Sequence, residues 1–418
     1  MKKRMVSALL VSAMVLSVVG CGSKDAAADT TTDAAAEETA DTDDESTTET
    51  ADAAGDVNAT VIWRAFDDQF QSGFRIIMDN QAKELGGIKL DMQDAANDVS
   101  TANNKLDAAL TKGTDVVAIC APDRESTETM AEKCNTDGVP AVFFNMEPME
   151  STMEKYDDIY YVGAEAKQSG EMCAQALINY WNANKEIADK NGDGVLQLVI
   201  LQGEIGQQDV SLRTQAYEDT LKAQGIDYEI LAMDTANWDQ AQALDKMNAW
   251  ITAYGIDGIE GVLCNNDNMA MGAVQACLNN GYNSGDPEKF VPIVGIDANI
   301  DALEAMKAGS LLGTVLNDRQ NQSTAIINVI KAAKAGQEVT ENVVGVDCTV
   351  DGKYICRYLK NITYAFCNGG QGTESQDCKF CFCILRCFQA EKNVIIINSN
   401  VNHRDGHAFR NAAGGIGP

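Results

Sequence analysis

The segment DKNGDGVLQ places oxygen-bearing residues at alternate positions and a glycine at its sixth position. This spacing is typical of an EF-hand calcium loop, which binds the ion through carboxylates, amides and one backbone carbonyl. The twelfth position of an EF-hand carries a bidentate glutamate, but here it is Ile200. The loop alone therefore lacks one carboxylate. Its expected ligands are Asp189, Asn191, Asp193, Gln197 and, through the carbonyl, Val195.

Acidic and carboxamide residues also follow several short apolar runs, at Asn145, 265–267, Asp297 and 317–318. Such residues either cap the following helices or line a shared cleft, because open α/β sheets bind ligands at the carboxyl ends of their strands. Four similar endings favour the cleft. Carboxylates, carboxamides and arginines satisfy the hydroxyls of a small polyhydroxylated ligand. Trp238 and Phe70 either cover its apolar faces or belong to the core.

These side chains must be positioned by a regular alternation of strands and helices that begins at Val57. Apolar runs such as 59–66, 116–120, 141–145 and 196–201 indicate strands, and amphipathic runs such as 211–224 and 239–254 indicate helices. This order is typical of parallel sheets covered by helices on both faces. About 290 residues of it exceed one core, so we expect an α/β fold with two lobes.

The N-terminal residues predict an exported protein held at a membrane by lipid. Residues 1–21 combine three basic residues, an apolar run and the sequence VVGC, which resembles a bacterial lipobox with Cys21 as the lipidated residue. Residues 22–56 are acidic and lack large apolar side chains, so we expect a disordered tether. The net charge of −30 argues against nucleic acid, or a membrane surface apart from the lipid anchor, as a partner.

Longer motifs carry a resemblance to a known family. The segments VFFNMEP, YYVGAEAKQSGE, DTANWDQAQALDKMNAW, NNDNMAMGAV and AGSLLGTVLND resemble bacterial periplasmic glucose/galactose-binding proteins, across residues 57–355. The resemblance implies the type I periplasmic binding protein fold, with two Rossmann-like lobes joined by three hinge strands. We expect residues 57–164 and 318–346 in the first lobe, and 165–317 and 347–355 in the second. The implied function is a monomeric receptor that encloses glucose, galactose or a close monosaccharide and delivers it to the permease of an ABC importer.

The resemblance also implies site residues. It places the missing calcium ligand at Glu260, completing a structural Ca²⁺ site. Two positions depart from the family pattern, because Arg64 replaces a tyrosine and Gln207 replaces a histidine, so the preferred hexose stays open. The implied sugar-binding residues, with these two included, are Arg64, Asp68, Phe70, Asn145, Gln207, Asp209, Arg213, Trp238, Asn266, Asp297 and Asn317.

Other functions fit less well. No histidine occurs before His403, so nucleophilic systems that need histidine are excluded from the body of the chain, and we expect no enzyme. Paired carboxylates for glycoside hydrolysis stay as an alternative. A repressor would need a basic DNA-reading module at the N-terminus, where this chain is acidic. Presentation of the sugar to a chemoreceptor or kinase shares the binding step and stays open.

Residues 356–418 depart from the family and carry six of the 13 cysteines and both histidines. We interpret this segment as a non-native tail produced by a frameshift or gene-model error near residue 356. A zinc site at Cys378–Cys387 with His403 and His407, and an unrecognised appendage, are the alternatives. The body cysteines lie in apolar patterns and are expected to be small buried side chains without disulfides: Cys120, Cys134, Cys173, Cys264, Cys277 and Cys348.

Overall fold

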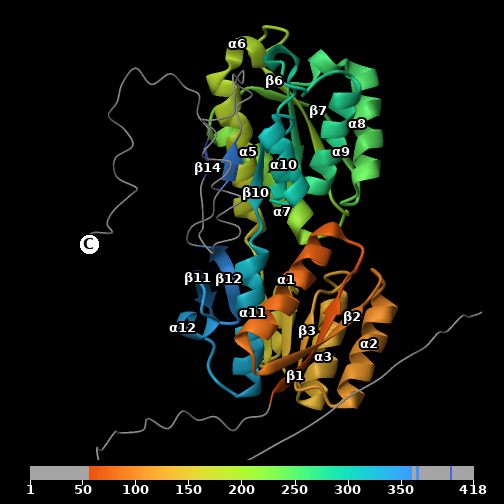
Figure 1. Ribbon diagram of the computed structural model, residues 1–418, viewed down its shortest axis with the longest axis vertical. Coiled ribbons are helices and arrows are strands. Elements are labelled where there is room, and N and C mark those ends of the chain that lie inside the picture. Colours follow the sequence, from red (N-terminus) through yellow and green to blue (C-terminus); the bar gives the residue numbers. More distant parts are fainter. Residues whose placement is uncertain (1–55, 360–363, 367–395, 398–418) are drawn as a thin grey trace, which may run out of the picture. The chain divides into compact units, whose positions relative to one another are not determined.

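The computed structural model describes residues 56–359, 364–366 and 396–397 (Figure 1). The predicted signal peptide with Cys21, the tether up to residue 55, the tail cysteines after Cys356, His403 and His407 lie outside these residues. Between them, the described strands form two sheets. Each sheet with its helices is one lobe, and this confirms the predicted two-lobed α/β fold.

The first lobe is built on a sheet with the strand order β11-β12-β5-β4-β3-β1-β2. Neighbouring strands from β2 to β12 run parallel, and β11 pairs antiparallel with β12 at the edge. The central strands are short and buried along their whole length, as expected for a sheet covered on both faces. Its strands are β1 (Val57–Trp63), β2 (Ile88–Asp94), β3 (Val116–Ile119), β4 (Ala141–Phe144), β5 (Ile159–Val162), β11 (Cys348–Asp351) and β12 (Tyr354–Leu359).

The second lobe repeats this plan with the strand order β14-β13-β10-β9-β8-β6-β7. Parallel pairing runs from β7 to β10, and β13 pairs antiparallel with β10. Its strands are β6 (Leu196–Gln202), β7 (Tyr228–Thr235), β8 (Gly261–Cys264), β9 (Ile293–Asp297), β10 (Gly313–Leu316), β13 (Tyr364–Phe366) and β14 (Ile396–Ile397).

Helices cover both faces of each sheet (Figure 1). The first lobe has α1 (Gln69–Leu85), α2 (Val99–Lys112), α3 (Ser126–Asp137), α4 (Glu150–Lys155), α11 (Arg319–Lys334) and α12 (Glu341–Val344). The second has α5 (Ala166–Ala183), α6 (Lys185–Ala188), α7 (Gln208–Ala223), α8 (Gln240–Tyr254), α9 (Asp267–Asn279) and α10 (Ile300–Ala308), with 3₁₀ turns at Ile256–Gly258 and Pro287–Lys289. Among the described residues, no helix is both long and apolar enough to cross a membrane.

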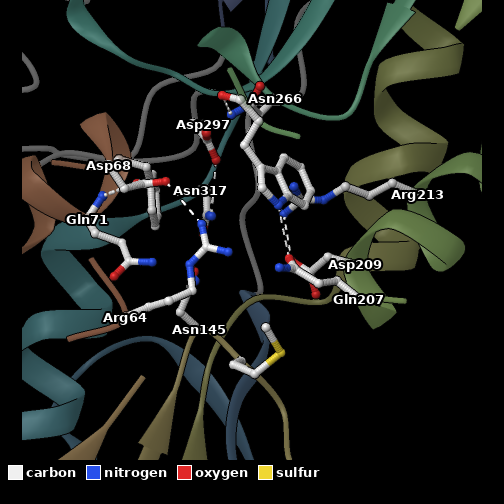
Figure 2. Close-up of a pocket in the computed structure, with 13 residues that line it drawn as sticks. Arg64, Asp68, Gln71, Asn145, Gln207, Asp209, Arg213, Asn266, Asp297 and Asn317 are labelled. Atoms are coloured by element: carbon white, nitrogen blue, oxygen red, sulfur yellow. Dashed lines mark hydrogen bonds and ion pairs between the residues drawn. The ribbon is translucent and has the colours of Figure 1, made fainter. Parts of the chain in front are cut away.

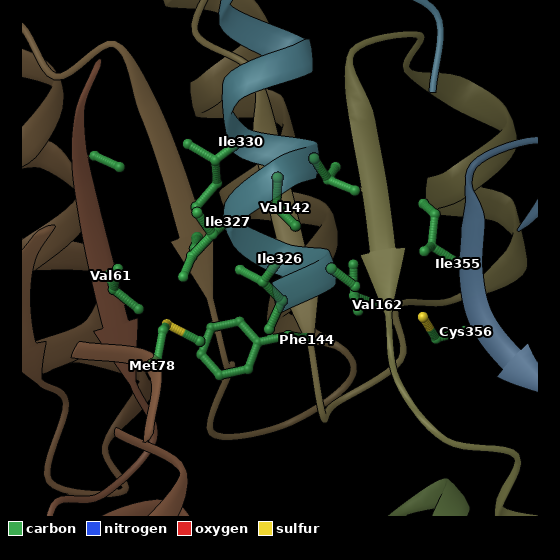
Figure 3. Close-up of a cluster of buried hydrophobic side chains, with 14 of the residues drawn as sticks. Val61, Met78, Val142, Phe144, Val162, Ile326, Ile327, Ile330, Ile355 and Cys356 are labelled. Atoms are coloured by element: carbon green, nitrogen blue, oxygen red, sulfur yellow. The ribbon is translucent and has the colours of Figure 1, made fainter. Parts of the chain in front are cut away.

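One core cluster shows how a distant segment completes the first lobe. Helix α11 follows the whole second lobe in the chain, yet its residues Ile326, Ile327 and Ile330 pack on the strands of the first sheet (Figure 3). Phe144 of β4 and Ile355 of β12 belong to the same cluster and are fully buried. Helix α11 and strand β12, which follow the second lobe in the chain, therefore contribute to the first lobe's core.

The placement of β11 and β12 corrects one expectation. Residues 347–355 lie with the first lobe and not with the second, because β12 pairs with β5. Residue 356, where we expected a non-native tail to begin, lies inside β12, and the backbone of residues 364–366 pairs with β10 in the second lobe. Two chain crossings between the lobes are described, at 163–165 and 317–318. The third expected crossing, between residues 346 and 347, is not found there, because residues 347–355 stay with the first lobe.

The cysteines follow the expectation with one exception. Cys348 and Cys356 form a disulfide, so the prediction of an unpaired Cys348 is wrong. Both lie on the antiparallel β11 and β12, which brings together residues eight apart in the chain. The remaining predicted cysteines are free and buried: Cys120, Cys134, Cys173, Cys264 and Cys277.

Candidate functional site

A pocket lies between the two lobes and is lined by all eleven residues predicted for sugar binding (Figure 2). Most of them lie at or just after the carboxyl ends of parallel strands in both sheets, as expected for ligand sites in α/β folds. Phe70, Asp209 and Arg213 lie on the helices α1 and α7. The remaining cavity is about 50 Å³, well below the roughly 300 Å³ of a typical ligand pocket. The lobes therefore stand close together around this pocket.

On the first lobe, Asp68 has two roles. Its Oδ1 accepts a hydrogen bond from the backbone N–H of Gln71, at 2.8 Å, and so caps α1. Its Oδ2 lies 3.3 Å from Nη2 of Arg64, which follows β1. Capping a helix and lining the cleft are thus not alternatives, because the carboxylate of Asp68 does both. The cap fixes the side chain that faces the pocket.

Asn266 does the same on the second lobe, where its Oδ1 accepts from the backbone N–H of Met269 at 3.0 Å and caps α9. Three other lining residues have positive φ, namely Asn145 (61°), Trp238 (64°) and Asp297 (128°). Such backbone is costly for non-glycine residues and concentrates at functional sites. The surrounding sheets hold these side chains in the cleft.

Arg213 of α7 is the most enclosed cation of the pocket, with 4% of its surface exposed. Its Nη2 lies 3.0 Å from Asp209 Oδ2, and its Nη1 donates to the carbonyl of Asn265 at 2.8 Å. The guanidinium lies 5.8 Å from the centre of the Trp238 ring, within range of a cation–π contact. Burial raises the pKa of Asp209, and the nearby Arg213 opposes that shift.

Asp297 ends β9 and is almost fully buried. Burial raises the pKa of Asp297 far above its ordinary value, although Arg213 favours the charged form. Asn317 donates to its Oδ1 at 3.3 Å. Asp267 at the start of α9 also has a raised pKa because of burial, and it accepts from Thr314 Oγ1 at 2.7 Å. Burial thus favours the protonated forms of Asp297 and Asp267 at pH values where exposed aspartates are ionised.

Three residues of the site were missed by the sequence reading. Gln71 and Met146 line the pocket, and each lies within three positions of a predicted residue. Both directly follow a predicted residue, Phe70 or Asn145, so a search of the neighbouring positions would have found them. Glu204, two residues beyond β6, contacts Arg64 across the lobes. No spacing in the sequence indicates that contact, because it joins residues 140 positions apart.

The predicted metal loop lies between α6 and β6 and is held mainly by its own backbone. The carboxylate of Asp189 accepts from the N–H groups of Gly192 and Gly194 at 2.8 and 3.0 Å. Asp193 Oδ1 accepts from the N–H of Val195 at 2.8 Å. The amide of Asn191 donates to Asp193 Oδ2 at 3.0 Å, and that of Gln197 donates to the same oxygen at 2.9 Å.

Glu260, the predicted distant ligand, does reach this loop. Its two oxygens accept from the N–H groups of Lys190 at 2.7 Å and Gln197 at 3.1 Å. Burial raises its pKa, and the backbone donors oppose that shift. The oxygen-only donor set suits a hard cation. In the described part of the chain, however, no three or more His, Cys, Asp or Glu side chains are gathered so that they could hold a metal ion.

Comparison with known proteins identifies the family. A family model described as a periplasmic binding protein domain matches residues 30–338. The chain belongs to this family. It is 38% identical over 288 residues to the D-galactose/methyl-galactoside binding periplasmic protein MglB of Haemophilus influenzae, covering 69% of the chain and 85% of that protein. A putative rhizopine-binding protein of Rhizobium meliloti is 32% identical, over 66% of the chain and 84% of the relative.

Solved structures agree on the fold of this periplasmic binding protein. A solute-binding protein from Bacillus halodurans with bound myo-inositol has a TM-score of 0.59 at 24% identity, covering 69% of the chain and 92% of that chain. One from Actinobacillus succinogenes with bound D-allose has a TM-score of 0.58 at 23% identity, covering 68% and 93%. Members of the family are solute-binding receptors and not enzymes. Glycoside hydrolysis by the cleft carboxylates is therefore set aside.

Proposed function

We propose that the protein captures glucose, galactose or a close monosaccharide between its two lobes outside the cytoplasm and delivers it to an ABC importer. The observation that supports this is the gathering of eleven predicted side chains around one pocket between the lobes. The similarity to a relative named for galactose and methyl-galactoside binding supports the same class of ligand.

The chemistry of the pocket suits a neutral sugar. Asp68, Asp209 and Asp297 accept hydrogen bonds from hydroxyls, while Arg213 and the carboxamides donate. The Nε atoms of Arg64 and Arg213 are buried, and no hydrogen-bond partner for them occurs among the described residues. Sugar oxygens would satisfy such donors. Trp238 supplies an apolar ring for the C–H face of a pyranose.

Calorimetric titration of the whole chain, freed of bound solute, tests this function. Glucose and galactose are the ligands, and ribose and xylose are the controls. We expect one hexose to bind in a 1:1 complex at least tenfold more tightly than either pentose, because a pentose leaves one set of pocket groups unpaired. Absence of binding to all four sugars by folded protein would contradict the proposal.

We further propose that the loop Asp189–Gln197 and Glu260 hold a structural Ca²⁺ ion. The ion would neutralise the carboxylates of Asp189, Asp193 and Glu260 and bind oxygens of Asn191, Gln197 and Val195. The approach of Glu260 to the backbone of this loop supports the proposal. Thermal unfolding before and after removal of the metal tests this proposal.

We propose as well that the chain is exported and anchored by a lipid on Cys21. The lipobox-like sequence VVGC supports the lipid anchor. The Haemophilus influenzae relative is named as a periplasmic protein, which supports export. Labelling of cells with a radioactive fatty acid is expected to mark the wild-type protein and not the Cys21→Ser variant. Equal labelling of both would contradict the anchor.

A further inference from the structure

A line of polar contacts crosses the cleft through a side chain outside the predicted site. Asp68 contacts Arg64, whose Nη1 lies 3.2 Å from Oε2 of Glu204 on the other lobe. The same glutamate oxygen accepts from Nε2 of Gln207 at 2.9 Å. The Oε1 of Gln207 then accepts from Trp238 Nε1 at 3.0 Å (Figure 2). Glu204 thus joins the two positions, 64 and 207, that depart from the family pattern.

Arg64 depends on both lobes for its partners. Its side chain is 9% exposed, and a buried guanidinium is costly unless carboxylates pair with it. One partner, Asp68, lies on the same lobe, and the other, Glu204, lies on the second lobe. Arg213 differs, because its partner Asp209 lies one turn away on the same chain segment. Of these two arginines, only Arg64 has an ion-pair partner on the other lobe.

We propose that Glu204 is a positioning residue that couples lobe closure to sugar recognition. Its carboxylate holds Arg64 and Gln207 in the pocket and stabilises the closed arrangement of the lobes. Because Glu204 is 42% exposed at the rim, dissolved salt screens this ion pair. The affinity for an uncharged sugar consequently depends on ionic strength. The statement about affinity rests on the proposed function, whereas the statement about closure does not.

The test compares Glu204→Gln with the wild type and with a matched control. The control is Glu218→Gln, which removes an exposed ion pair with Lys222 inside the second lobe. Hexose binding is titrated at low and high salt. We expect wild-type affinity to fall about two- to threefold from about 0.05 to 0.5 M NaCl. Glu204→Gln should bind about three- to fivefold more weakly at low salt, with no salt response, and the control should match the wild type.

Small-angle X-ray scattering without sugar gives an independent readout. The wild type should become more open as salt rises, and Glu204→Gln should be open at both salt concentrations. If no sugar binds but scattering shows this difference, the proposed function fails and the closure role stands. If a sugar binds and Glu204→Gln keeps both the wild-type affinity and the wild-type salt response, the role of Glu204 is overturned.

Arg64→Met extends the test to the partner residue. If the two side chains act through one contact, Arg64→Met should also lose the salt response, and adding Glu204→Gln should not change that response further. A salt response that persists in Arg64→Met and disappears only with Glu204→Gln would overturn the assigned partner.

Discussion

The pocket between the lobes and the loop Asp189–Gln197 both concentrate carboxylates, but they hold them by different means. In the pocket, Asp68 stands at the start of α1 and Asp297 at the end of β9, and they pair with arginine or asparagine side chains. In the loop, Asp189 and Glu260 accept mostly backbone N–H groups. The sheets therefore set the pocket's geometry, while the loop's geometry depends on its own backbone. Damage to the pocket should change affinity, and damage to the loop should change stability.

The largest effect on affinity is expected from Trp238→Ala. Loss of the ring removes the apolar face and the contacts to Arg213 and Gln207. We expect hexose affinity to fall about 100-fold, equivalent to about 2.8 kcal/mol, with a melting temperature close to wild type because the ring is only partly buried. Tyr254→Ala is the control, since Tyr254 ends α8 and is 43% exposed. Equal loss of hexose affinity in Trp238→Ala and Tyr254→Ala would contradict the assignment of Trp238 to the sugar site.

Calcium removal should lower the stability of the protein and leave its hexose affinity nearly unchanged, which is the opposite of the result expected for Trp238→Ala. Chelation is expected to lower the melting temperature, because an ion present at 100 times its dissociation constant stabilises the folded state by about 2.7 kcal/mol. For about 300 folded residues, each with an unfolding entropy of about 2.1 cal/mol/K, the shift is about 4 °C. Hexose affinity should change less than threefold, as no loop residue lines the pocket.

The control for calcium removal is Asp193→Asn, which should lower the melting temperature of the calcium-loaded protein and weaken its response to chelator. An unchanged melting temperature after confirmed removal of divalent ions would contradict the calcium proposal. A large loss of affinity after chelation would instead show that the two regions are coupled.

Gly203→Ala tests how the pocket is supported from behind. A Cβ atom at Gly203 would collide with the Trp238 ring, so only glycine lets the ring lie against this backbone. We expect the ring to shift, with about tenfold weaker hexose binding and a changed tryptophan fluorescence spectrum. Gly258→Ala is the matched control, because its Cβ would have only an ordinary contact with Tyr254. Unchanged affinity in Gly203→Ala would show that the ring position is not critical.

The way in which each part of the molecule is held also explains what could be predicted from the sequence. The residues around Asn145, Asp297 and Asn317 were predicted because the carboxyl ends of parallel strands converge at one sheet edge. Glu204 was not, because its contact with Arg64 depends on how the lobes meet. The placement of residues 347–355 was wrong for a similar reason. Local patterns predict a strand, but the partner strand, here β5, is decided by tertiary packing.

The smallest expected effect is a pH dependence of stability that comes from the floor of the pocket. Burial raises the pKa of Asp297 and Asp267 in the folded protein. Unfolded aspartates release their protons near pH 4. Between about pH 5 and pH 8 the folded state therefore binds more protons than the unfolded state, so stability falls as pH rises. We expect the melting temperature of the sugar-free protein to drop by a few degrees over this interval.

Asp297→Asn should reduce that drop, because the amide keeps the shape of the protonated acid and cannot ionise. Asp257→Asn is the control, since Asp257 lies in the exposed turn Ile256–Gly258, away from the pocket. Asp257→Asn should keep the full drop in melting temperature. If Asp297→Asn also keeps the drop in melting temperature, the protons are held elsewhere and Asp297 is ionised in the folded protein. The ionised Asp297 would then have to be stabilised by pairing with Arg213. The pocket and the loop Asp189–Gln197 would in that case differ less than the structure indicates.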